Sequence, residues 1–147
     1  MRPLAVREVR TLGEVDPAAA WALLGDLARA AAWSPVSRCS WQGDVPARGD
    51  RFAAELRRAW GGSTPIGCRV AAWEAGARFR IDLEGLSRLE EPSFEVALRT
   101  EPRAGEPRAT VSLTFRAKAG LGMRLVARPL AARRLRRSLR RLERLLR

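Results

Sequence analysis

Apolar and charged residues alternate with a period of two along much of the chain. In the clearest stretch, Phe79, Ile81 and Leu83 are separated by charged residues. This alternation predicts strands with one buried and one wetted face. Similar patterns predict strands at 4–12, 36–42, 51–59, 66–73, 78–84, 94–98 and 111–115. We therefore expect an antiparallel sheet of six or seven strands, with a Pro- and Gly-containing loop at 101–107 before the last one.

Three segments have the features of helices. Asp16-Pro17 is a typical helix start, and the Ala- and Leu-rich run at 18–24 continues it. A second short helix is expected at 26–32, before Ser34-Pro35. Both short helices follow the first strand.

The third helix is the longest, at 121–146. Its leucines stand mostly three or four residues apart, at positions 121, 125, 135, 139, 142 and 146. This spacing predicts an amphipathic helix roughly 39 Å long, whose apolar stripe covers the sheet. Pro129 cannot donate a backbone hydrogen bond, so a bend is expected at 125–129.

Three motifs resemble the START-like polyketide cyclase/dehydrase and lipid-transport superfamily. They are the run 15–26 followed by Trp33-Ser34-Pro35, the segment Gly49-Asp50-Arg51-Phe52, and Gly120-Leu121-Gly122 before the long helix. The resemblance covers nearly the whole chain. It implies a single α+β domain over 1–147 with the helix-grip fold, in which a curved antiparallel sheet wraps around a long C-terminal helix.

The resemblance also implies an apolar cavity between the sheet and the long helix, which would bind a lipid, a polyketide or another hydrophobic molecule. Alternation shows which residues are buried, so each inward-facing residue is either a ligand contact or simply core. The expected ligand-binding residues are Phe52, Leu56, Arg58, Trp60, Val70, Phe79, Ile81, Leu83, Phe94, Val96, Leu98, Val111, Leu113, Phe115 and Met123.

Arg58 is the polar member of this set. On a regular strand it would point inward with Leu56 and Trp60, where a guanidinium needs an anion. Alternatively, Arg58 lies at the open end of the strand, or at a bulge, and reaches solvent. Glu74 is an internal candidate partner, although its position at a turn favours exposure.

The composition excludes several mechanisms. The chain has no His, no Tyr and a single Lys, Lys118, so a Ser-His-Asp triad, an imidazole base and a His-containing zinc site are impossible. Cys39 and Cys68 lack metal-ligand spacing, and we interpret them as free, packed thiols. Gly120-x-Gly122 lacks the third glycine of a dinucleotide loop. We expect no metal and no cofactor, and no catalytic residue is assigned; an aromatase/cyclase-type enzyme remains the alternative to a binding protein.

The positive charge is concentrated at the C-terminal end. Residues 121–147 carry ten Arg and one acidic residue, and therefore +9 of the formal net charge of +12. This basic helix is interpreted first as a solvated face, then as a contact for an anionic membrane surface, and last as a nucleic-acid contact without sequence specificity. The charged N-terminal segment lacks the apolar core of a signal peptide, so a cytoplasmic location is expected.

Overall fold

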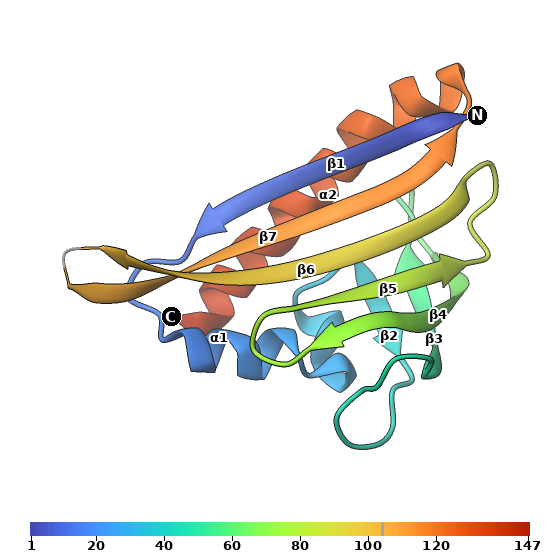
Figure 1. Cartoon of the computed structure of the whole chain (residues 1–147). Coiled ribbons are helices and arrows are strands. Elements are labelled where there is room, and N and C mark those ends of the chain that lie inside the picture. Colours follow the sequence, from blue (N-terminus) through green and yellow to red (C-terminus); the bar gives the residue numbers. More distant parts are fainter. Residues whose placement is uncertain (104) are drawn as a thin grey trace.

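The fold is a curved antiparallel sheet with helices on its concave face (Figure 1). In the computed structural model, which describes residues 1–103 and 105–147 and all their side chains except that of Arg103, seven strands form one sheet. Their spatial order is β1-β7-β6-β5-β4-β3-β2. The strands are β1 (Arg2–Thr11), β2 (Val36–Cys39), β3 (Arg51–Arg57), β4 (Ser63–Glu74), β5 (Arg78–Glu84), β6 (Glu90–Arg103) and β7 (Glu106–Ala119).

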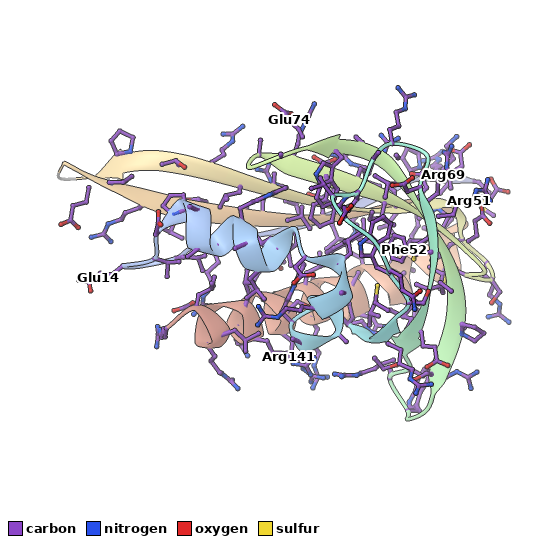
Figure 2. The ribbon with its side chains drawn as sticks, turned by 90° about the horizontal axis from the view of Figure 1, so that it is seen from below. Glu14, Arg51, Phe52, Arg69, Glu74 and Arg141 are labelled. Carbon is purple, nitrogen blue, oxygen red and sulfur yellow. The ribbon has the colours of Figure 1, made fainter. Side chains whose placement is uncertain are left out.

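The helices occupy the predicted places. They are α1 (Pro17–Leu24), the 3₁₀ helix η1 (Leu27–Ala32) and α2 (Leu121–Leu146). At the start of α1, the Asp16 side chain accepts a hydrogen bond from the backbone N–H of Ala18 at 3.3 Å. Seen at right angles to Figure 1, α1 and α2 lie on the same side of the sheet (Figure 2). The expected helix-grip fold is confirmed.

Several strand ends differ from the predictions. β2 stops at Cys39 and β3 at Arg57, both earlier than predicted. β3 ends there because a turn with Gly61 and Gly62 at positive φ follows it, and the β2–β3 pairing is irregular near Val36. β6 and β7 continue into the predicted loop at 101–107, where Pro102 and Pro107 lie opposite each other near the strand ends. Ala104, which belongs to that predicted loop, lies outside the described residues.

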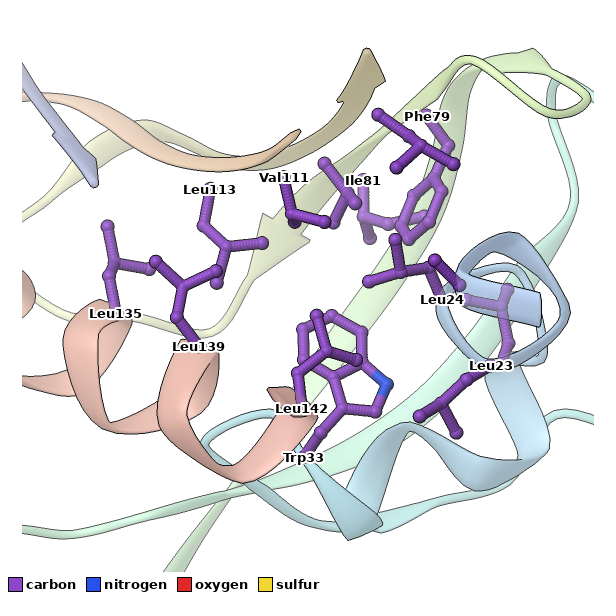
Figure 3. Close-up of a cluster of buried hydrophobic side chains, with 14 of the residues drawn as sticks. Leu23, Leu24, Trp33, Phe79, Ile81, Val111, Leu113, Leu135, Leu139 and Leu142 are labelled. Atoms are coloured by element: carbon purple, nitrogen blue, oxygen red, sulfur yellow. The ribbon is translucent and has the colours of Figure 1, made fainter. Parts of the chain in front are cut away.

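The C-terminal half of α2 (135–146) is packed into the core. Leu135, Leu139 and Leu142 are at most 3% exposed and lie opposite the sheet (Figure 3). In the N-terminal half (121–130), by contrast, Leu121 and Leu125 are 66% and 69% exposed. The expectation that the whole apolar stripe covers the sheet is therefore wrong. The helix packs on the sheet mainly at β1 and β7, and the leucines that it buries are all in its C-terminal half.

Glu143 attaches the C-terminal end of α2 to the sheet edge. It is the single acidic residue of the helix, and its carboxylate accepts hydrogen bonds from Arg10 on β1 and from Arg147. The hydrogen bond from Arg10 is the main cause of a lowered pKa of Glu143, although burial opposes it. The charged form of Glu143 therefore stabilises the folded chain. The bend predicted at 125–129 stays a prediction; Pro129 lies inside the continuous helix.

Replacing Glu143 by Gln is expected to lower the free energy of unfolding by about 1 to 2 kcal/mol at pH 7, because the variant loses charge-assisted hydrogen bonds. Since the folded-state pKa is lowered, this contribution is complete above the unfolded pKa of about 4.3 and is lost as the pH falls through the folded value. Urea unfolding at pH 7 and pH 3 measures the difference. The exposed Glu14→Gln variant is the control; equal losses in both variants, or a loss independent of pH, would contradict the prediction.

Candidate functional site

A cavity of about 480 Å³ lies under the sheet. Its walls come from the concave side of β3 to β7, from the segment of η1 and β2, and from residues 127–135 of α2. Most of the lining side chains are aliphatic or aromatic. The exposed lining residues form its mouth, and they are Arg58, Ala59, Trp60, Ser87 and Leu130.

The structure brings nine of the expected residues together around this cavity. They belong to β3, to the turn after it, and to the inward faces of β5, β6 and β7. These residues are Phe52, Leu56, Arg58, Trp60, Phe79, Ile81, Leu83, Phe94 and Phe115. Their role in binding a ligand stays a prediction.

The other six expected residues do not line the cavity, which corrects their assignment. Five of them are at most 7% exposed and belong to the packed core, namely Val70, Val96, Leu98, Val111 and Leu113. Side chains of α1 and of the C-terminal half of α2 fill that end of the concave face (Figure 3). The sixth, Met123, is half-buried in the first turn of α2. Strand parity predicts the face on which a residue lies, but it does not predict which part of that face is filled.

Sequence reasoning missed other wall residues. Leu86 and Leu89 come from the loop between β5 and β6, and Trp33 from the end of η1. Ala127 and Ala131 come from α2, one turn apart, so that two small side chains face the cavity. That spacing of small residues was a usable signal, because small side chains on an inward helix face leave space beneath it.

Arg58 lies at the mouth rather than inside. β3 ends at Arg57, and the exposed Arg58 donates a hydrogen bond from Nε to Oγ1 of Thr64 at 2.8 Å. The alternative interpretation, an open strand end in contact with solvent, is confirmed. Glu74 is not its partner: Glu74 is exposed on the side of the sheet away from α2 (Figure 2) and pairs with Arg78 at 3.0 Å.

The cavity has little acid–base chemistry of its own. Among the residues that the structure describes, no Asp or Glu lines it, and no cluster of His, Cys, Asp or Glu could hold a metal ion. Cys39 and Cys68 do line it as free thiols. Burial raises the pKa of Cys39, and burial with the nearby Cys39 raises the pKa of Cys68 to about 12. Both thiols are therefore protonated, and poor nucleophiles, at neutral pH.

The basic face of α2 is exposed, as expected. Its outward residues are Arg133, Arg136, Arg137, Arg140 and Arg144. Arg136 is partly neutralised by Glu8 of β1 at 3.3 Å. Attachment of this face to an anionic membrane surface stays a prediction.

Comparison with known families agrees with the fold. The model of the family described as polyketide cyclase/dehydrase and lipid transport matches residues 4–147. The chain belongs to this family. No curated protein matches it in sequence.

Solved structures similar to this polyketide cyclase/dehydrase and lipid transport family member share its fold at low sequence identity. A START superfamily protein from Mycobacterium smegmatis is 13% identical with a TM-score of 0.73, over 97% of this chain and 96% of that one. The protein DR_A0006 from Deinococcus radiodurans is 20% identical with a TM-score of 0.65, over 96% and 95%. The di-domain ARO/CYC StfQ of the steffimycin biosynthetic pathway is 11% identical with a TM-score of 0.77, over 99% of this chain and 51% of that one.

Within the described residues, no helix combines the length and the apolar character that crossing a bilayer requires.

Proposed function

We propose that this chain binds a hydrophobic small molecule, such as a lipid or a polyketide, in the cavity between the sheet and α2. The observation that carries the proposal is the cavity itself. Its volume of about 480 Å³ falls within the range typical of small-molecule sites, about 300 to 1,000 Å³. Family membership supports the same function.

Burial of apolar surface supplies the binding free energy. Each methylene group that a ligand moves from water into an apolar site gains about 0.8 kcal/mol, before the entropic cost of association. Phe52, Phe79 and Phe94 provide flat apolar walls, which suit an alkyl chain or a planar ring system. The ligand is therefore held mainly by its shape and its apolar surface.

A second candidate is an aromatase/cyclase-type enzyme acting on a bound polyketide. The guanidinium groups of Arg58 and Arg134 at the cavity are the observation in its favour, since a fixed cation stabilises a developing enolate. The test is whether the protein converts a poly-ketone substrate. Conversion by the wild-type chain that is abolished in the Arg58→Gln/Arg134→Gln variant would support this candidate.

Binding is tested with the neutral fluorescent probe N-phenyl-1-naphthylamine, after native mass spectrometry has identified any molecule that co-purifies with the protein. We expect saturable binding of one probe per chain, with the enhanced emission of an apolar site. Co-purified molecules are removed first by partial unfolding and refolding. A chain that refolds to its original circular dichroism spectrum and binds no probe would overturn the proposal.

A further inference from the structure

A second hollow, of about 220 Å³, lies beside the mouth of the cavity and is surrounded by arginines. One is the last residue of β3, one follows it directly, and four come from α2. They are Arg57, Arg58, Arg133, Arg134, Arg137 and Arg141, together called the arginine cluster. In Figure 2, Arg141 lies on the side of α2 away from the sheet. The hollow is several times the volume that one water molecule occupies, about 30 Å³.

The arginine cluster has no internal counter-charge. In the part of the chain that the structure describes, no carboxylate lines the hollow, and none lies within ion-pair distance of these six side chains. Burial, with Arg137 nearby, lowers the pKa of Arg134. The pKa of Arg141 is lowered mainly by burial, and further by the nearby positive charges of Arg57, Arg137 and Arg144. These directions reflect positive charges that are held close together and partly withdrawn from water.

The arginine cluster is continuous with the apolar cavity. Pro35, Arg58, Ala59, Leu130 and Arg134 line both spaces. A molecule whose apolar part fills the cavity can therefore extend its other end through the mouth to the neighbouring guanidinium groups.

We propose that the ligand is an amphipathic anion, whose apolar part occupies the cavity and whose phosphate or carboxylate group binds in the arginine cluster. This inference rests on the proposed function, since it names the chemical class of the molecule bound there. The planar guanidinium group donates two parallel hydrogen bonds to a carboxylate or phosphate, which makes arginine the side chain suited to either group. Such an anion would also reduce the repulsion among the six charges.

An ordinary solvated basic face does not account for this arrangement. Exposed charges along one helix spread apart into water, whereas here arginines from the end of β3 and from α2 line one hollow. Arg133 and Arg137 are exposed, but Arg134 and Arg141 are half-buried. Arg136 and Arg140 show the contrast on the same helix, because they line neither space.

The test compares ligands that share one apolar tail. The bound N-phenyl-1-naphthylamine is displaced in competition titrations at constant ionic strength. The competitors are dodecyl phosphate, dodecanoate and 1-dodecanol, and inorganic phosphate serves as the anion that lacks an apolar tail. The measurements are repeated with Arg137→Gln/Arg141→Gln and with Arg136→Gln/Arg140→Gln. The second variant has the same net charge and leaves the arginine cluster intact. Removing like charges, and in the second variant also the ion pair of Arg136 with Glu8, is not expected to prevent folding, which circular dichroism checks.

We expect the two anionic amphiphiles to bind at least tenfold more tightly than 1-dodecanol. This advantage should fall below threefold in Arg137→Gln/Arg141→Gln and persist in Arg136→Gln/Arg140→Gln. Equal binding of all three amphiphiles, or equal loss in both variants, would overturn the inference while the neutral probe still supports the proposed function. Inorganic phosphate that binds to the cluster as tightly as dodecyl phosphate would also overturn it, because the tail would then contribute nothing.

Discussion

Replacing Ala131 by Trp is expected to weaken the binding of N-phenyl-1-naphthylamine at least 100-fold. Ala131 is half-buried on α2 and faces the cavity, so the indole ring would occupy the space that the ligand needs. The added side chain enters an existing void rather than a packed core, and for this reason the fold should keep its stability. Fluorescence titration measures the affinity, and thermal unfolding measures the stability.

The matched control for this variant is Ala22→Trp. Ala22 lies on α1, is exposed and does not line the cavity, so the same substitution there should leave the affinity unchanged. If Ala131→Trp folds normally and binds the probe like the wild-type chain, the probe does not bind in this cavity. If both variants lose binding, the effect of the added ring is not local.

Replacing Leu142 by Ala is expected to lower the free energy of unfolding by about 3 to 5 kcal/mol. Leu142 is fully buried, at 0% exposure, and belongs to the core cluster beneath the sheet, as does Trp33 (Figure 3). Truncation loses the transfer free energy of the removed carbon atoms and leaves a void among rigid neighbours. Urea unfolding followed by circular dichroism measures the change.

Leu125→Ala is the control in the same helix. Leu125 is 69% exposed, so its truncation should change the free energy of unfolding by less than about 0.5 kcal/mol. Similar losses in the two variants would mean that both halves of α2 are packed alike, which would contradict the burial described above.

The order and type of the elements could be predicted because each has a local signal. Phe79, Ile81 and Leu83 alternate with charged residues, Asp16 and Pro17 start α1, and the leucine spacing identifies α2. The ends of β2, β3 and β6 could not be predicted from the same signals. They depend on register shifts and on pairing with neighbouring strands, which are properties of the assembled sheet.

The site was predictable only in part, for a different physical reason. Val96 and Phe94 both lie on β6, and parity assigned both to the cavity, yet Val96 is at 0% exposure in the core while Phe94 lines the cavity. What separates them is the position of α1 and α2 under the sheet. The convergence of Arg57 with Arg141 was equally invisible, because these residues lie far apart in the sequence and meet only in the folded chain.

The unequal burial of α2 divides the helix into two parts that differ in how readily they detach. Residues 135–146 share the core, so they separate from the sheet only when the whole protein unfolds. Residues 121–130 leave large leucines in water, and Pro129 deprives this part of one backbone hydrogen bond. Local opening of this part therefore costs less free energy than opening of residues 135–146, and it would widen the cavity at Ala127 and Leu130. For the proposed ligand, exchange by this route would cost less free energy than global unfolding.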